Sequence, residues 1–162
     1  MANISLSTPI VTIFRINDDL FARALDGISS EQLWRRLTER NNSMLWIAGH
    51  ITHTRAEMLG LMGSPFDTGW RDLFARGSSV GDSDKYPSIG EIKRVLGEIN
   101  EKMYAMLESL DEAQLAKPFP GSEQPQPKTV ADQLAGFAFH DCYHVGQLGY
   151  IRKGLGHAAV AR

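Results

Sequence analysis

Histidine is the residue type in this chain best suited to chemistry, and four of the five histidines lie in two stretches with a helical pattern. His140 and His144 are four residues apart, so they project from one helix face with β-carbons about 5–6 Å apart, close enough to bind one metal ion. His50 lies close to the inward stripe of an earlier helix. Three imidazoles on two facing helices would leave open coordination positions, which is typical of a catalytic rather than a structural zinc site. The alternative for each is a histidine on a helix surface or hydrogen-bonded in the core.

One more histidine and two acidic residues are close to these three in the sequence. His53 follows His50 by three residues and precedes Glu57 by four, so the three can share one side of the helix. We favour a half-exposed His53 paired with Glu57 over a role beside a metal. Asp141 adjoins His140 but points about 100° away from it. That direction favours a solvated or interface acid over a carboxylate that supports a metal ligand.

Other side chains and missing motifs narrow the chemistry. Cys142 is two residues from each paired histidine and faces away from both, so a buried thiol is favoured over a catalytic nucleophile. His157 lies in the tail and is expected to be exposed. The chain has no H-E-x-x-H zinc-protease motif and no E-x-x-H motif of ferritin-like di-iron proteins. It also lacks a glycine-rich phosphate loop and a C-x-x-C pair.

Four long segments must position these residues. Apolar residues recur in them at three- and four-residue steps, which predicts amphipathic helices within 8–27, 42–63, 88–110 and 129–154. The inward stripe of the first is expected to include Ile13, and that of the second Leu61. No segment alternates as a half-buried strand does. The whole chain, residues 1–162, is therefore predicted to be one all-α domain with the fold of a four-helix bundle.

Local signals mark the helix ends. Thr8 precedes Pro9, so the threonine is expected to cap the first helix and the proline to fit its first turn. Ser29 with Gln32 predicts a capping box and a short helix, and residues 112–115 resemble that segment in sequence. Ser88 with Glu91 predicts a second capping box, at the start of the third helix.

Two connections are unusual. About 24 residues, 64–87, join the second and third helices, and connections of that length tend to be functional or mobile. Trp70, Leu73 and Phe74 within it indicate one helical turn that docks on the bundle. The connection 116–128 holds four of the seven prolines, so it cannot be helical.

Composition excludes several classes of protein. The chain has 162 residues, 43% hydrophobic, which is enough for a full core without disulfides, and its single cysteine suits a reducing compartment. No apolar run is long enough for a membrane helix, and no basic start marks a secretory signal. A net charge of −2 argues against an extended nucleic-acid surface. We therefore expect a cytoplasmic protein that acts on a small molecule, without nucleic acid or membrane as partner.

Two segments carry a recognisable pattern: Gly49-His50, preceded by Asn42-Ser43 and Trp46, and H-D-C-Y-H-V-G-Q-L at 140–148. They resemble the DinB-like superfamily, which includes the YfiT-type metal hydrolases, and the resemblance extends over nearly the whole chain. It implies a divalent metal, often zinc or nickel, held by His50, His140 and His144. Gln147 matches a family position, where it can orient a ligand ring or cap an internal polar group.

Two functions of different classes remain open at this point. The first is a metal-dependent enzyme that activates water for hydrolysis or, as the resemblance implies for some relatives, uses a low-molecular-weight thiol for transfer or isomerisation. Glu57 and Asp141 are the nearest candidates for a general base. The second is a non-enzymatic, metal-binding homodimer that senses or sequesters a ligand, with its methionine-rich stripes and long connection at an interface.

Overall fold

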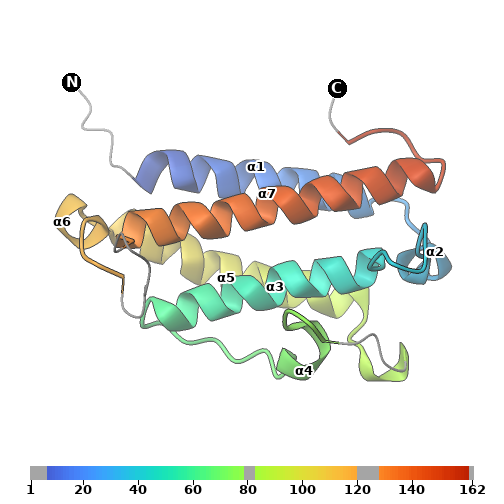
Figure 1. The fold of residues 1–162 in the computed structure, drawn as a ribbon, viewed down its shortest axis with the longest axis horizontal. Helices are drawn as coiled ribbons and strands as arrows, with labels where there is room; N and C mark the ends of the chain where they lie inside the picture. The colour runs from blue at the N-terminus through green and yellow to red at the C-terminus, as the bar shows by residue number, and fades with distance from the viewer. Residues whose placement is uncertain (1–6, 79–82, 120–127, 161–162) are drawn as a thin grey trace.

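The computed structural model describes residues 7–78, 83–119 and 128–160, and within them it is a four-helix bundle, as predicted (Figure 1). The long helices are α1 (Ser7–Leu25), α3 (Met44–Leu61), α5 (Ile89–Ser109) and α7 (Val130–Gly154). Shorter helical segments are α2 (Ser30–Trp34), α4 (Arg71–Phe74), η1 (Ser83–Lys85) and α6 (Glu112–Leu115). In this part of the chain only Pro118 and Thr129 pair as an isolated bridge. None of the helices described is both long and apolar enough to cross a membrane.

The directions of the long helices explain the long connection. α1 and α7 run side by side in one direction, whereas α3 and α5 run together in the other (Figure 1). Two consecutive helices that point the same way must be joined by a chain that returns along the bundle. The connection between α3 and α5 makes this return, and it carries α4 onto the outside of α3.

α3 is the most buried of the long helices. All its residues from Met44 to Ala56 are buried, because α2, α4, α5 and α7 all pack against it. The predicted inward stripe therefore left out residues that are buried in the first two thirds of α3. It also wrongly included Leu61, which is 55% exposed. Ile13 of α1 is exposed as well, contrary to prediction, and the buried face of that helix includes Asn17 instead.

The helix starts were predicted with one error and one partial error. Ser43 and Thr129 cap α3 and α7. Ser88 caps α5, but the Glu91 side chain pairs with Arg94 and does not complete the capping box. Thr8 is not a cap, because α1 already includes Ser7. The two similar short segments are α2 and α6, and both have complete capping boxes.

Candidate metal centre

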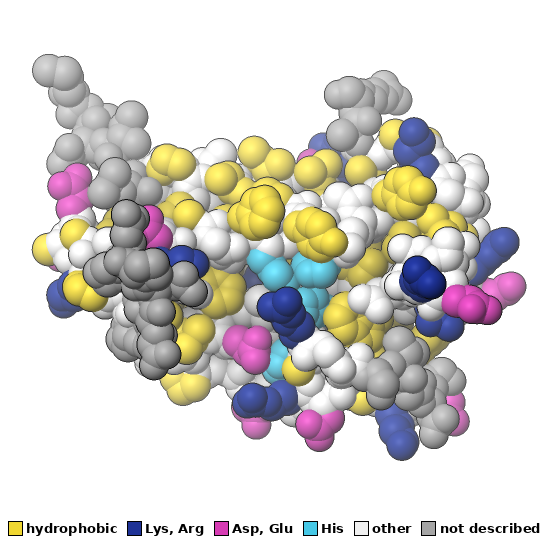
Figure 2. Space-filling view, in the orientation of Figure 1, with side chains coloured by type: hydrophobic (Ala, Val, Ile, Leu, Met, Phe, Trp, Pro, Cys, Tyr) yellow, Lys and Arg dark blue, Asp and Glu magenta, His cyan; other side chains and the backbone are white. Residues whose placement is uncertain are grey.

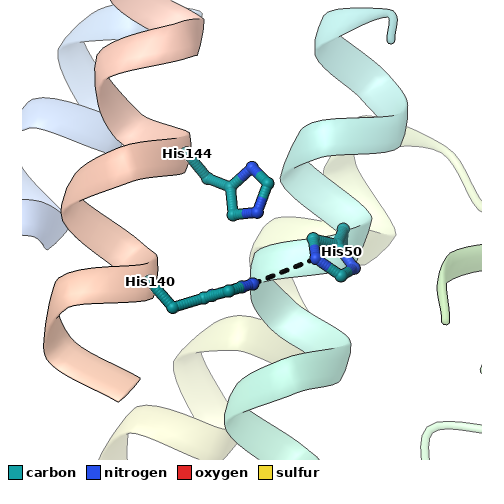
Figure 3. A group of neighbouring side chains, drawn as sticks. All are labelled: His50, His140 and His144. Carbon is teal, nitrogen blue, oxygen red and sulfur yellow. Dashed lines mark hydrogen bonds between the residues drawn. The ribbon is translucent and has the colours of Figure 1, made fainter. Parts of the chain in front are cut away.

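Three histidines from two helices converge in the middle of the bundle. His140 and His144 project from α7 toward His50 of α3 (Figure 3). The Nε2 atoms of His50 and His140 are 3.0 Å apart, and one nitrogen of each ring lies within 4.8 Å of the others. The side chain of His140 is 29% exposed, and histidine side chains reach the surface on the face shown in Figure 2, so the site is open to solvent. The structure thus brings together the three histidines proposed from the sequence, His50, His140 and His144, here called the triad.

The long connection fixes the orientation of His50. The Nδ1 atom of His50 donates to the carbonyl oxygen of Phe74 over 2.6 Å. That carbonyl is close because the Phe74 ring packs directly against Gly49, where any Cβ would come within 2.2 Å of the ring. Trp46 adds two further contacts: its ring stacks on His50, and its Nε1 donates to the Leu73 carbonyl. With Nδ1 used as a donor, the Nε2 lone pair of His50 faces the other two histidines.

Gln147 does the same for His144. The Nδ1 atom of His144 donates to Oε1 of Gln147 over 2.8 Å, one helical turn further along α7. Of the two uses left open for Gln147, it therefore orients a histidine ring. A metal-binding histidine commonly donates its second ring N–H to an oxygen in this way.

His140 is held less firmly. Its Nδ1 is buried without a hydrogen-bond partner, and the closest carboxylate oxygen, Oδ1 of Asp141, is 3.8 Å away. At that distance the contact is an electrostatic approach and not a hydrogen bond. His140 is therefore the member of the triad with the greatest freedom to turn toward an ion.

Burial favours the neutral form of His50 and of His144. The pKa of His144 is lowered from 6.5 to about 4 by burial and by the neighbouring His140. The pKa of His50 is lowered too, mainly by burial, and the carbonyl of Phe74 and the charge of Glu57 only partly offset this. Neutral imidazoles are the form that binds a metal. Burial thus favours the metal-binding form of His50 and His144.

His53 pairs with Glu57 as expected, but it is buried rather than half-exposed. Its Nδ1 contacts the hydroxyl of Thr68 at 3.1 Å, and its Nε2 lies 3.5 Å from Oε1 of Glu57 without a hydrogen-bond partner. The burial comes from the long connection, which brings Thr68 over the ring. Glu57 itself is about half exposed, at the rim of the site.

Asp141 is neither solvated nor at an interface, contrary to prediction. It is 1% exposed and accepts from the Nε of Arg55 at 2.7 Å. Arg55 is fully buried and also donates to Asp18 and Asn100, at 2.6 and 2.5 Å. Burial alone would lower the pKa of Arg55, but the carboxylates of Asp141 and Asp18 outweigh it and raise that pKa.

Sequence reasoning missed this buried ionic cluster of Arg55 and its partners. The signal that could have found it is the position of Arg55 on the same helix face as Ile51, Met58 and Leu59, since a charge on an apolar face needs a buried partner. The side chain of Cys142, predicted to be buried, is exposed on α7, where it accepts a hydrogen bond from Asn17. His157 is half-buried and contacts Gln32, so it is not the exposed tail residue expected.

Two surface hollows differ in their position relative to the histidines and in the side chains that line them. One of about 270 Å³ lies beside the histidines, between α7 and the start of α3, and includes Gln147 in its lining. Neither hollow is lined by one of the three histidines, but the first is linked to them through Gln147, which accepts from His144. The second hollow is more open, has a volume of about 910 Å³ and lies between α1, α5 and the end of α7. Its arginines are engaged with the protein: Arg23 pairs with Asp19, and Arg152 donates to the carbonyls of Ala24, Asp26 and Ala158. We therefore place the chemistry at the smaller hollow.

These features define a class: an all-helical bundle with three histidines placed to hold one metal ion. The model of the DinB superfamily matches residues 13–148, and the chain belongs to that superfamily. A conserved protein from Enterococcus faecalis has the same fold, with a TM-score of 0.74, 13% identity, and 93% of this chain and 96% of that one covered. YfiT from Bacillus subtilis has a TM-score of 0.69 and 15% identity, with 98% and 93% covered. YfiT is described as a probable metal-dependent hydrolase with an unusual four-helix bundle topology. A comparison with curated proteins finds no match.

Proposed function

We propose that this protein is a metal-dependent hydrolase of a small molecule, with a zinc or nickel ion held by His50, His140 and His144. The observation that carries the proposal is the convergence of three imidazoles, each with one ring nitrogen within 4.8 Å of the others. The description of YfiT as a probable metal-dependent hydrolase supports the same class of reaction.

The donor set fits such an ion. Zinc–nitrogen distances of about 2.0–2.1 Å place two ligand nitrogens within about 4.2 Å of each other, so the observed spacing needs only small side-chain movements. Three neutral ligands leave at least one coordination position open. When bound, a divalent ion supplies Lewis acidity, which polarises a carbonyl oxygen and lowers the pKa of water toward about 7.

In the described part of the chain, Glu57 is the carboxylate best placed to accept a proton near the triad. Of the two carboxylates expected from the sequence, Asp141 is buried against Arg55 and neutralised by it. Glu57 is half exposed, and its charge raises the pKa of His50, so it lies within electrostatic reach of the triad. We assign the general-base role to Glu57, with the buried His53 limiting the directions that its carboxylate can take.

Metal analysis of the purified protein tests the site itself. Wild-type protein should bind close to one equivalent of zinc or nickel, and the double variant His140→Ala, His144→Ala should bind none. His157→Ala is the matched control, because that histidine contacts Gln32 and belongs to no cluster with the triad. Equal metal content in wild type and the double variant would exclude the site.

Turnover tests the reaction. Metal-loaded protein should hydrolyse members of an ester and amide panel, and the Glu57→Gln variant should keep its metal while losing about 10²–10⁴-fold in rate. A panel of thiols with electrophiles runs in parallel. Turnover only with a thiol would replace hydrolysis by thiol transfer, and metal binding without turnover in either panel would favour a non-enzymatic module.

A further inference from the structure

The 270 Å³ hollow beside the triad, here called the Gly146 pocket, is built differently from the site itself. It lies between α7 and the start of α3, and its walls include two aliphatic and two aromatic side chains. Gly146 forms part of the α7 wall, and a Cβ at this position would meet no atom within 4 Å. The main wall residues are Ile47, Ile151, Tyr143, Tyr150 and Gly146.

The pocket adjoins the metal ligands directly. Gln147 lines it and also accepts the hydrogen bond from Nδ1 of His144. Tyr143 lines it and meets the His144 ring edge to face, with ring centroids 5.0 Å apart. On the other wall, Ile47 is one helical turn before His50. A molecule whose reacting group lies at the histidines can therefore extend into the pocket without crossing another element.

The lining also limits what can enter. Among the residues that the structure describes, no aspartate, glutamate, lysine or arginine lines the pocket, so none of them would compensate a charged group removed from water. Its polar groups are the neutral amides of Asn41, Asn42 and Gln147 and the two tyrosine hydroxyls. Tyr143 and Tyr150 are 57% and 70% exposed, so both have surface left to cover a ligand.

Size selects among uncharged groups. A dry cavity of about 150 Å³ is enough to hold benzene, so a pocket of about 270 Å³ has room for one ring and a short linker. Aromatic rings bury a large area and favour edge-to-face contacts, which two tyrosines can provide.

We infer that the Gly146 pocket receives an uncharged, ring-sized apolar group of the molecule whose reacting group lies at the three histidines. This inference rests on the proposed function and names the class of substrate that the site takes. It also explains why a glycine suits position 146, because a longer side chain there would project into the space that the ligand needs.

Hydroxamates of one head group and different tails test the inference by calorimetry on zinc-loaded protein. Acetohydroxamate serves as the head alone, and phenyl-substituted hydroxamates with zero to three methylenes in the linker supply the ring. At least one phenyl compound should bind tenfold or more tightly than acetohydroxamate. Its para-carboxyl analogue should lose that gain, because no cation in the lining can pair with the carboxylate.

Two glycine variants locate the effect. Gly146→Leu should abolish the gain from the phenyl ring, while zinc content and acetohydroxamate affinity stay unchanged. Gly136→Leu is the matched control: it lies on the same helix, also has open space at its Cβ and does not line the pocket. This control should behave as wild type, and both variants should fold at least as stably, because leucine favours a helix over glycine.

The outcomes separate the two proposals. Failure of wild-type protein to bind either zinc or nickel, or of the metal-loaded protein to bind acetohydroxamate, would overturn the metal site and the inference with it. Normal zinc and acetohydroxamate binding with no gain from any phenyl tail would overturn the Gly146 pocket alone. A gain that survives Gly146→Leu would also overturn it.

Discussion

At the scale of single residues, carbonyl oxygens determine which nitrogen of a histidine is available. His50 donates its Nδ1–H to the backbone of Phe74, and His144 donates its Nδ1–H to the amide of Gln147. In both rings the proton is held on Nδ1, away from the triad, so the lone pair is on Nε2. His140 has no such partner, and it is also the ring whose Nε2 approaches that of His50. We infer that two rings are preset and the third adapts.

Gly49→Ala should weaken metal binding without touching a ligand. The new methyl group would come within 2.2 Å of the Phe74 ring, which must then move and take with it the carbonyl that orients His50. Loss of such an orienting partner lowers metal affinity by about 10–100-fold. Competition with a chromogenic chelator measures this affinity.

Gly60→Ala provides the control on the same helix. A Cβ at Gly60 meets no atom within 4 Å, so this variant should keep wild-type metal affinity and gain up to about 1 kcal/mol of helix stability. Equal metal affinity in the two alanine variants would show that Phe74 does not hold His50 in place.

The lowered pKa of His144 predicts how acid affects the metal-free protein. The unfolded chain takes up this proton near pH 6.5, but the folded protein does so only near pH 4. Between these values the unfolded state binds more protons. The free energy of unfolding should therefore fall as pH drops from about 6.5 to 4, by at most about 1.4 kcal/mol per pH unit for this group.

Urea titrations in the presence of EDTA, at several pH values, measure this slope. His144→Gln should have a shallower slope than wild type over the same range, because the titrating group is gone. His157→Gln, which changes a histidine outside the triad, should keep the wild-type slope. Parallel slopes in wild type and His144→Gln would contradict the assignment.

The parts of the site that could be predicted are those whose residues are close together in the sequence. The i, i+4 spacing of His140 and His144 follows from helix geometry and needs no tertiary structure. The partner of Asp141 is Arg55, 86 residues away, and the carbonyl that orients His50 is 24 residues away. Such pairings depend on the relative rotation of helices, which periodicity in one segment does not define.

At the scale of elements, the connection between α3 and α5 is part of the site. Its length was predicted, and so was a docking turn with Phe74, which is fully buried as the last residue of α4. The sequence did not explain why the connection is so long, because the relative direction of two helices is a property of the tertiary structure. Since α3 and α5 are parallel, the returning chain passes over α3 and brings Thr68 to His53 and Phe74 to His50. It also brings the Leu73 carbonyl to Trp46.

The side chain of Ser43, at the start of α3, should contribute about 1 kcal/mol to the free energy of unfolding. Ser43 is buried and its hydroxyl accepts from the backbone N–H of Trp46. Ser43→Ala leaves that N–H without a partner, so the free energy of unfolding should fall by about 0.5–2 kcal/mol in urea denaturation. Ser109→Ala, at the exposed end of α5, should change it by less than about 0.5 kcal/mol. Equal losses of stability in Ser43→Ala and Ser109→Ala would mean that the cap of α3 does not stabilise the protein more than an exposed serine does.

At the scale of the whole molecule, one buried charge links all four long helices. Arg55 of α3 contacts Asp18 of α1, Asn100 of α5 and Asp141 of α7, and Tyr104 of α5 donates to Asp18. A buried guanidinium has a large desolvation cost, which these carboxylates offset. Because Asp141 directly follows His140, the cluster also fixes how α7 presents its histidines to α3.

A double-mutant cycle tests whether this cluster holds the bundle together. Arg55→Met should lower the free energy of unfolding by about 3–5 kcal/mol, because it leaves the carboxylate of Asp141 buried without a partner. Asp141→Asn should cost less, since Asp18 still compensates the arginine. The double variant should be more stable than the sum of the two losses predicts, with a coupling of about 1–3 kcal/mol.

The surface arginine of α5 shows what a merely exposed ion pair contributes. Arg94 pairs with Glu91 and Glu98 but its side chain is about half exposed, so Arg94→Met should change stability by no more than about 1 kcal/mol. Urea denaturation followed by circular dichroism at pH 7 measures all four variants. Strict additivity of Arg55→Met and Asp141→Asn would mean that the two side chains are in contact without being coupled. In that case the relative position of α3 and α7, and with it the histidine triad, would depend on apolar packing alone.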